Sequence, residues 1–558
     1  MMFFTRDCRA HHLVLALVCL LIPSSLLAFQ GSPSLSVSPG PFRIAGTIIS
    51  STSGTPLARA RVTIGDTKNL QRRQWMITGD DGRFEFNQIA ASKYSLQGAK
   101  KGFISAGYDE HEQFSTAIVT GAGMDTEHLI FRLAPSAVLT GRVLDESGEP
   151  VRRANVNLYS EDRRTGVSRI IRINSDVTDD RGSFEFAELD SSAYFLSVSA
   201  TPWYALHPVA GRPEGAENVV TMVDRSLDVA YPMTFYANAT ESDEATPIPL
   251  RGGDRIQLDI HVNPAPALHL LFRVANSQGD AISMPQLQKR TFDTADWVQP
   301  GGTMQMLSPG LVEITGVAAG RYFVGNQNAS GDSAPQSAEV ELSENGQELQ
   351  IPTSEPPASI KASVHVVGAS QLPQQLMLVL RNAKQRPVAF QQVNPQGEVE
   401  FLDVAPGQYT LMAATANKPY SVLRMSSEGT ALGHALNIQA GSSVTLAISL
   451  IGGEGNVEGF AKRDGKPVAG AMIVLVPKNP ESNRELFRRD QSDLDGSFSL
   501  RSVIPGLYTV VAIENGWDLD WSEPGVIAHY CQHGREIQVS DRAEGPIHLD
   551  SAVEVQAK

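Results

Sequence analysis

The sequence offers few residues whose type and spacing could support catalysis or metal binding. His529, Cys531 and His533 stand close together near the C-terminal end. The run around them, from Pro524 to Gly534, begins with proline and ends with glycine, which is typical of a short helix. On a helix the two histidines share one face while Cys531 points elsewhere, and two histidines are too few for a structural zinc site. We interpret this cluster as a surface helix without a metal.

Pairs of acidic residues are the next candidates, because clustered carboxylates can bind calcium through six or more oxygens. The pairs are Asp80-Asp81, Asp179-Asp180 and Asp493 with Asp495. Each stands just before a glycine, where aspartate commonly bonds to its own backbone in a turn, and we favour that interpretation. The sequence shows no Ser-His-Asp grouping, glycine-rich phosphate loop or H-E-x-x-H motif. We therefore expect no enzyme, no catalytic residue, no metal and no cofactor.

Arginines recur at one topological position in three parts of the chain, between an alanine-containing strand and an Asp-Gly turn. They are Arg72 and Arg73, then Arg163, Arg164, Arg169 and Arg172, and finally Arg488 and Arg489. Charged residues on an edge strand discourage pairing between sheets, and we favour this protective role. The alternative is a row of anion-binding sites for an acidic polysaccharide or a partner protein.

Two aromatic pairs complete the candidate ligand-contacting residues. Trp203 with Tyr204, and Trp517 with Trp521, follow a repeated tyrosine at comparable intervals. Exposed rings could stack on sugars, whereas rings buried beneath a long loop would belong to the core. We favour burial and keep sugar contact as the alternative.

Most of these candidates stand at fixed distances from a pattern of residues that is repeated along the chain, which we call the frame. Counted from a glycine, bulky apolar residues stand at +2, +4 and +7, and a tyrosine stands at +12. The five copies are Gly82-Phe84-Phe86-Ile89-Tyr94, Gly182-Phe184-Phe186-Leu189-Tyr194, Gly310-Val312-Ile314-Val317-Tyr322, Gly397-Val399-Phe401-Val404-Tyr409 and Gly496-Phe498-Leu500-Val503-Tyr508. The frame predicts a turn at the glycine and a strand with +2 and +4 on one face. A second strand then opens with the tyrosine, whose hydroxyl should find a partner.

The preceding part of the unit is repeated as well. In the first, second and fifth copies, a Gly-x-Pro turn is followed by an alanine and then by a β-branched residue. These positions are Pro56, Ala60 and Val62; Pro150, Ala154 and Val156; and Pro467, Ala471 and Ile473. The alanine and the branched residue share one strand face, so we expect both to point inward.

The complete pattern, opened by Gly141-Arg-Val143 and its counterparts, resembles the carboxypeptidase regulatory-like domain, a transthyretin-like member of the carbohydrate-binding-like fold. The resemblance is strong in the first, second and fifth modules and partial in the third and fourth. It implies seven-stranded Greek-key β-sandwiches that serve as accessory or binding modules rather than enzymes. We therefore predict an all-β chain, built as a tandem array of about five prealbumin-like sandwiches.

The expected divisions follow the repeat. They are a signal peptide at 1–28, a linker at 29–41, carboxypeptidase regulatory-like modules one, two and five at 42–133, 136–262 and 454–558, and atypical modules three and four at 265–352 and 356–450. Arg6 and Arg9 precede an apolar run from Leu13 to Ile22, which is typical of a secretory signal. After cleavage near residue 28 only Cys531 remains, so the sandwiches must be stable without disulfides. We expect no transmembrane segment after the signal peptide.

Charge and architecture together limit the function. The net charge of −15, without a dense Lys/Arg run, argues against nucleic acid as a partner. We predict an exported, non-catalytic rod of sandwiches, located in the periplasm, at the cell surface or outside the cell. The first hypothesis is carbohydrate binding or adhesion at the cell envelope, with a polysaccharide as partner. The alternatives are a structural protein that docks another envelope protein, without a small ligand, and an enzyme hidden in modules three and four.

Overall fold

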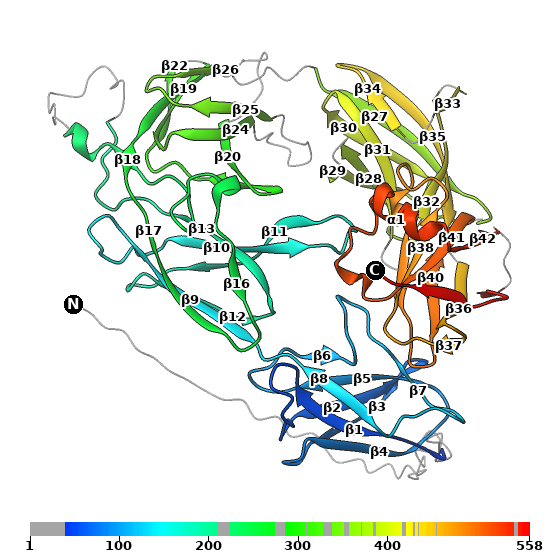
Figure 1. Ribbon diagram of the computed structural model, residues 1–558. Helices are drawn as coiled ribbons and strands as arrows, with labels where there is room; N and C mark the ends of the chain where they lie inside the picture. Colours follow the sequence, from blue (N-terminus) through cyan, green and yellow to red (C-terminus); the bar gives the residue numbers. More distant parts are fainter. Residues whose placement is uncertain are drawn as a thin grey trace, which may run out of the picture.

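The structure is a computed structural model of the chain. It describes residues 40–208, 224–273, 285–308, 310–326, 337–350, 356–369, 371–382, 387–415, 420–427, 430–432, 435–453, 455–540 and 545–558. Within these ranges the regular secondary structure is almost entirely β-strand, with one α-helix, α1 (Pro524–Cys531). Figure 1 shows the strands grouped into sandwiches that follow one another along the sequence. The predicted all-β fold is confirmed. The expected signal peptide and almost all of the linker lie outside the described residues.

The first module sets a connectivity that recurs along the chain. Its described strands are β1 (Phe42–Ser50), β2 (Arg61–Asp66), β3 (Asn69–Ile77), β4 (Arg83–Ile89), β5 (Lys93–Ala99), β6 (Ala106–Gly107), β7 (Ile118–Val119) and β8 (Leu129–Leu133). In one sheet β1 is antiparallel to β4 and parallel to β8. In the other sheet β2 lies between β3 and β5, and β6 and β7 pair with β5. Strand β3 is therefore an edge strand.

The second and third modules repeat this arrangement. The strands of the second are β9 (Ala137–Leu144), β10 (Asn155–Asp162), β11 (Arg169–Val177), β12 (Ser183–Leu189), β13 (Ser192–Ser199), β14 (Val229–Ala230), β15 (Thr234–Phe235), β16 (Ile248–Leu250) and β17 (Arg255–His261), with 3₁₀ turns η1 (Arg225–Leu227) and η2 (Ser242–Glu244). Those of the third are β18 (Ala265–Pro266), β19 (Leu268–Arg273), β20 (Pro285–Thr291), β21 (Thr294–Val298), β22 (Met304–Ser308), β23 (Leu311–Val317), β24 (Gly320–Asn326), β25 (Ser337–Leu342) and β26 (Glu348–Gln350). Strands β11 and β21 take the edge position of β3.

The fourth and fifth modules keep the central pairings, but in each of them the described strands connect into one nine-stranded sheet. The strands of the fourth are β27 (Ala358–Val366), β28 (Met377–Asn382), β29 (Pro387–Gln392), β30 (Glu398–Val404), β31 (Gly407–Ala414), β32 (Tyr420–Ser427), β33 (Thr430–Leu432), β34 (Ala435–Ile438) and β35 (Ser443–Gly452). Those of the fifth are β36 (Gly455–Arg463), β37 (Lys466–Pro467), β38 (Met472–Pro477), β39 (Arg488–Gln491), β40 (Ser497–Val503), β41 (Gly506–Ile513), β42 (Arg535–Val539), β43 (Ile547–His548) and β44 (Val553–Gln556), with η3 (Arg484–Leu486) and η4 (Gly516–Asp518). Edge strands β29 and β39 correspond to β3. The module boundaries themselves remain a proposal.

The repeated frame forms the cores. The five frame glycines have φ between +67° and +87°, a region that favours glycine. Asp81, Asp179 and Asp495 each accept a bond from the backbone N–H two residues later, so the turn interpretation of the acidic pairs is confirmed for these three. The apolar residues at +2, +4 and +7 are buried in every copy, as are the inward alanines Ala60 and Ala154. Each module has its own cluster of buried apolar side chains.

The five tyrosines share one hydrogen bond that fixes the corner between two strands. All five are buried, and each hydroxyl donates to the carbonyl oxygen four residues earlier in the sequence. The bonds are Tyr94 to Ala90 (3.2 Å), Tyr194 to Asp190 (3.0 Å), Tyr322 to Ala318 (2.9 Å), Tyr409 to Ala405 (2.7 Å) and Tyr508 to Ile504 (2.7 Å). A buried hydroxyl without a partner is costly, so this bond permits the ring to enter the core. The expectation of a buried tyrosine with a hydroxyl partner is confirmed.

The sequence did not reveal a left-handed residue at +6 of the frame. Its φ is +59° at Gln88, +56° at Glu188, +75° at Gly316, +55° at Asp403 and +58° at Ser502. The pairing register shifts at this point in all five modules. A bulge of this kind bends the strand toward the tyrosine corner. Only one of the five copies uses glycine there.

The prediction of an extended rod is wrong. In Figure 1 the modules follow a curved path, and the fifth (orange and red) lies beside the first (blue). The Lys93 ammonium, for example, lies 2.6 Å from the Asp493 carboxylate, 400 residues away in sequence. Polar and aromatic groups on loops and strand ends make this contact, and their spacing in the sequence carries no periodic signal.

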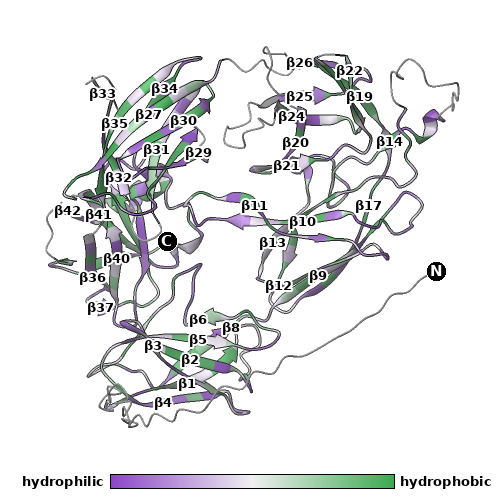
Figure 2. Ribbon diagram, turned by 180° about the vertical axis from the view of Figure 1, so that it is seen from behind, coloured by the Kyte–Doolittle hydropathy of each residue, from purple (hydrophilic) through white to green (hydrophobic). Residues whose placement is uncertain are grey.

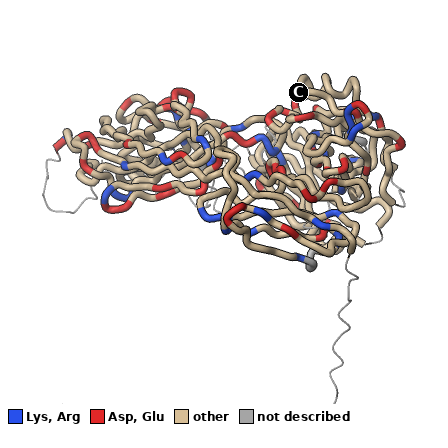
Figure 3. The backbone as a smooth tube through the Cα atoms, turned by 60° about the horizontal axis from the view of Figure 1, so that its bottom comes forward, with Lys and Arg blue, Asp and Glu red and all other residues tan. Residues whose placement is uncertain are grey.

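Surface features agree with the charge and hydropathy of the sequence. Figure 2 shows hydrophobic and hydrophilic residues alternating along many strands. In Figure 3 Lys and Arg are interspersed with Asp and Glu along the backbone. Among the described residues, no helix is both long and apolar enough to cross a membrane.

Candidate functional site

Arg489 joins three modules at the place where the chain closes on itself. Its guanidinium, on β39, donates to both carboxylate oxygens of Glu112 in the first module, at 3.2 and 2.6 Å. A further bond, of 3.3 Å, reaches the carbonyl oxygen of Arg164 in the second module. The side chains of Arg489 and Glu112 are only 4% and 16% exposed. A bidentate ion pair of this kind is among the stronger ones, and its free energy offsets part of the cost of burying both charges.

Aromatic rings enclose the same guanidinium. The carbon at its centre lies 4.2 Å from the ring centroid of Trp521, 5.3 Å from that of Phe114 and 5.9 Å from that of Trp517. His111, from the first module, stacks on Trp517 with centroids 5.0 Å apart and planes 5° from parallel. Cation–π contacts of this kind gain strength when water is excluded. The structure therefore brings together three of the predicted site residues, Arg489, Trp517 and Trp521, but around an internal contact.

A second group of bonds connects the first and fifth modules beside Arg489. Lys93 donates to Asp493 at 2.6 Å and to Ser497 at 2.7 Å, and the other Asp493 oxygen accepts from the backbone N–H of Ala117 at 3.0 Å. Burial raises the pKa of Asp493, while the nearby Lys93 lowers it. Burial also raises the pKa of Asp490, on β39, to about 6. The fifth-module acidic pair thus contributes to a contact between modules as well as to its own turn.

The hairpin between β10 and β11 supplies the second-module side of the junction. Ser522 donates its backbone N–H to the Gly166 carbonyl at 3.0 Å, and Asp520 accepts from the Ser168 N–H at 2.8 Å. Gly166 has φ of +83°, and a Cβ at that position would lie 2.5 Å from the Cβ of Ser522. Only glycine fits this close approach. The Arg163 guanidinium lies 2.6 Å from Glu161 and 3.7 Å from Asp520.

Three more of the predicted arginines, Arg164, Arg172 and Arg488, also have partners within the protein. Arg164 forms an exposed pair with Asp162 at 2.9 Å, and Arg172 lies 3.1 Å from Asp296 in the third module. Arg488 donates to three backbone carbonyls, of Ser502, Glu485 and Phe487. Burial lowers the pKa of Arg488. Each of these residues already has a partner within the protein. Ligand contact by them stays a prediction.

The second aromatic pair has a different environment. Trp203 is 85% exposed and meets Tyr204 edge to face, with centroids 5.9 Å apart. The Tyr204 hydroxyl donates to Glu146, which also accepts from Tyr231 at 3.1 Å. Burial was the favoured interpretation for both pairs. It holds for Trp521, at 6% exposure, and not for Trp203.

The first module has an open aromatic position that was not among the predicted site residues. Trp75, on the edge strand β3, is 65% exposed, and Arg73 is exposed on the same strand. The side chain of Arg72 lies outside the described part of the structure. The signal was available, because Trp75 stands two residues after Arg73 and alternate residues share one strand face.

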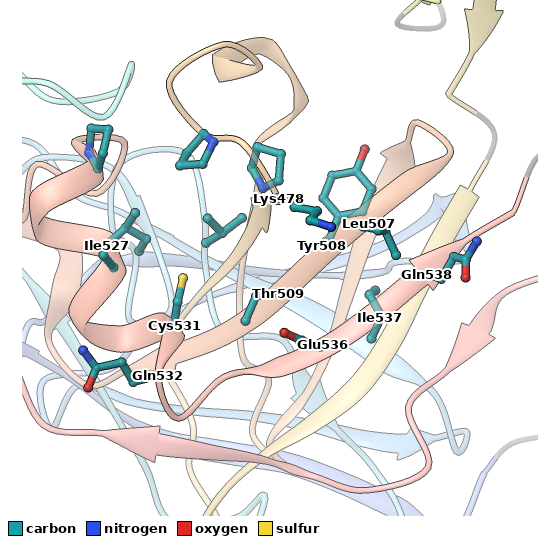
Figure 4. Close-up of a pocket in the computed structure, with 15 residues that line it drawn as sticks. Lys478, Leu507, Tyr508, Thr509, Ile527, Cys531, Gln532, Glu536, Ile537 and Gln538 are labelled. Atoms are coloured by element: carbon teal, nitrogen blue, oxygen red, sulfur yellow. The ribbon is translucent and has the colours of Figure 1, made fainter.

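A cleft in the fifth module contains Cys531, and a cysteine in a cleft can act as a nucleophile. It has a volume of about 690 Å³ and lies between α1 and strands β38, β41 and β42, as Figure 4 shows. Cys531 lines it, and burial raises the pKa of this thiol, which keeps it in the less nucleophilic protonated form. His529 and His533 are exposed. The predicted short helix is confirmed, and no group of three or more metal-ligating side chains occurs in the described ranges.

Comparison with known proteins gives one family. Solved structures with similarity include the Bacillus anthracis TIE protein, at 11% identity and a TM-score of 0.16 over 73% of this chain and 74% of that chain. The Streptococcal ancillary pilin gives 12% and 0.20, over 51% and 98%. GBS52, the minor pilin of Streptococcus agalactiae, gives 12% and 0.21, over 40% and 96%. These similarities are too low to bear on function, and no curated protein matches the chain. Residues 43–124 match the family model of the carboxypeptidase regulatory-like domain.

Proposed function

We propose that this chain is an exported, non-catalytic binding protein whose β-sandwich modules present ligand-binding surfaces at the cell envelope. Polysaccharide is the ligand class that we favour. The supporting observation is a set of exposed aromatic rings on equivalent edge strands: Trp75 on β3, Trp297 on β21 and Phe390 on β29, exposed by 65, 58 and 62%.

Edge strands usually carry charged residues or proline, because an open apolar edge invites unwanted pairing. A large exposed ring at this position in three modules needs a reason other than edge protection. Aromatic faces that remain in water are suited to stacking on flat, apolar faces of ligands such as sugar rings. The closed junction supports the same function, since a scaffold held by Arg489 keeps its modules in fixed relative positions.

A glycan array with the full chain tests this function. We expect binding to at least one polysaccharide class, and loss of most of it in the triple variant Trp75→Ala, Trp297→Ala and Phe390→Ala. Trp203→Ala is the comparison variant, because it removes an even more exposed ring that lies outside the edge strands. Binding that survives the triple variant and falls with Trp203→Ala would contradict the role of the edge strands.

The second candidate function is a structural protein that docks another envelope protein. The junction of the first, second and fifth modules favours it, because the aromatic and cationic residues there already serve contacts within the chain. Complete absence of glycan binding by the full chain would support this alternative over carbohydrate binding.

A further inference from the structure

We propose that the outward face of the β3-β2-β5 sheet in the first module binds an acidic polysaccharide, with Trp75 as the stacking platform and Arg61 and Arg73 as its cationic contacts. This inference rests on the proposed function and names its ligand class and one of its sites.

The strand register defines the face. Trp75 pairs with Thr63 on β2, and Thr63 pairs with Gln97 on β5. One row further along, Ile77 pairs with Arg61 and Arg61 with Ala99; in the opposite direction, Arg73 pairs with Gly65 and Gly65 with Ser95. Alternate residues of a strand point to the same side. Because Val62, Ile64 and Leu96 fill the core, these three rows point outward.

The two arginines of this face differ from the paired arginines of the second and fifth modules. Arg61 and Arg73 are exposed, and among the described residues neither guanidinium has a hydrogen-bond or ion-pair partner. By contrast, Arg163, Arg164 and Arg489 all have carboxylate partners. In a protein with a net charge of −15, two free guanidiniums beside an exposed tryptophan form a local site for anions.

The shape of the face is suited to an extended chain rather than to a single sugar. Arg73 and Arg61 lie in rows four residues apart, which is roughly 13 Å along the strands. Between them Trp75 stands beside the small Thr63, and Gly65 adds no side chain at all. A ligand that reaches both arginines and covers the indole must therefore span several sugar units and carry more than one acidic group.

The equivalent sheet face is covered in the fifth module and open in the first. Arg489 pairs with Val474 as Trp75 pairs with Thr63. In the fifth module this outward face is covered by the segment around α1, whose Trp521, Ile527 and Tyr530 form a second core with Val474. In the first module Trp75, Arg61 and Gln97 stay exposed. Within this chain, an arginine surrounded by aromatic rings, Arg489, thus already binds a carboxylate, that of Glu112.

Binding of the full chain to defined oligosaccharides tests the proposal. The probes are oligouronate, with one carboxylate per sugar, and a neutral β-glucan oligomer of the same length, measured by titration calorimetry. We expect binding to the oligouronate, weakened at least about tenfold by Trp75→Ala and by the double change Arg61→Gln with Arg73→Gln. Rising NaCl should weaken it further, since exposed charges are screened. Trp75→Phe should retain most of the affinity. Arg132→Gln, which removes an exposed arginine from β8 in the other sheet of the same module, should leave it unchanged.

The remaining outcomes separate this proposal from the general function. Equal binding of both oligomers, or oligouronate binding insensitive to the three substitutions, would overturn the acidic site while leaving a carbohydrate-binding function in place. No binding of either oligomer, together with an empty glycan array, would reject both. Self-association that Trp75→Ala abolishes in analytical ultracentrifugation would assign the face to a second copy of the chain and would also overturn the proposal. Because these side chains are exposed, the variants should fold normally.

Discussion

The Arg489 guanidinium and the Glu112 carboxylate, 377 residues apart in sequence, form a bidentate ion pair across the contact between the last and first modules. The rings of Trp521, Trp517 and Phe114 shield this pair from water. Shielding makes the pair sensitive to the loss of one partner, because the other charge then stays buried without compensation. The pair is therefore the element that most directly holds the chain in its closed form.

Arg489→Ala should open this contact. The buried Glu112 carboxylate loses its partner, and removal of one member of a buried pair typically costs about 3–5 kcal/mol. Small-angle scattering should show a larger radius of gyration than for the unchanged chain. Arg164→Ala is the control, since it removes an arginine whose pair with Asp162 is exposed and worth about 1 kcal/mol or less.

The double change Arg489→Met with Glu112→Leu separates charge from packing. Replacing a buried pair by apolar groups of similar size is often neutral, so we expect the double variant to stay more compact than Arg489→Ala alone. If Arg489→Ala left the scattering profile unchanged, the remaining bonds, such as Lys93 to Asp493, would be sufficient to hold the junction.

The sequence predicted the cores well because their signal is periodic and local. The glycine turn, the buried residues at +2 and +4 and the tyrosine all stand at fixed spacing, and alternation in a strand converts spacing into a face. The structure adds the hydroxyl bond of each tyrosine to a carbonyl four residues earlier, as between Tyr508 and Ile504. That bond is local too, so its existence could be expected from the frame.

The junction could not be predicted in the same way. Arg489 and Trp521 were recognised as unusual, but their partners Glu112 and Phe114 lie in a first-module loop without a repeat signal. Contacts between modules depend on how rigid bodies meet, and no spacing within one module encodes that. Strand alternation does place Trp75 on the same face as Arg73. Whether that face is open could not be predicted, because the equivalent face is open in the first module and covered in the fifth.

The left-handed residue at +6 leads to a prediction about stability. A non-glycine residue at φ near +57° has a steric cost of about 1–2 kcal/mol relative to a relaxed conformation, which glycine avoids. Gln88→Gly and Ser502→Gly should each stabilise their module by up to about 1 kcal/mol, after the entropy lost by glycine on folding. Chemical denaturation would show the shift in midpoint.

Gly316→Ala gives the opposite test at the same frame position. A Cβ there would lie 2.3 Å from the Gly302 nitrogen and 2.8 Å from His207 Nε2, so this substitution should destabilise the third module. A gain from Gly316→Ala, or losses from both glycine substitutions, would show that the +6 conformation is not the source of the cost.

The raised pKa of Asp490 predicts a pH dependence of stability. The folded protein holds this proton with a pKa of about 6, above the ordinary value near 4 of the unfolded chain. Between these two values the folded state binds more protons, so stability falls as pH rises from about 4 to about 6. The contribution is of the order of 3 kcal/mol, present in full below pH 4 and lost above pH 6.

Asp490→Asn isolates this contribution. The amide oxygen can still accept the 2.6 Å bond from the Ser499 N–H, but it does not titrate. We expect thermal unfolding of the variant to vary less between pH 4.5 and pH 7 than that of the unchanged protein. The Asp493 carboxyl, whose pKa is also raised by burial, leaves a smaller residual slope. An identical pH profile in the variant would refute the assignment to Asp490.

The core frame and the junction together predict how the chain unfolds. Phe84→Ala and Phe498→Ala each delete a buried ring, which costs roughly 3–5 kcal/mol, against a stability of about 5–15 kcal/mol for a single domain. The sequence alone suggests that one module then unfolds while its neighbours persist.

The contact of Arg489 with Glu112 changes this expectation for the first and fifth modules, because loss of either module removes the partner of the other. In Phe84→Ala, hydrogen exchange should therefore rise in both modules, with β39 and the residues around Trp521 among the first segments to exchange. In Phe84→Ala combined with Arg489→Ala, the fifth module should no longer respond to the first. Exchange confined to the first module in the single variant would show that the junction does not couple the two.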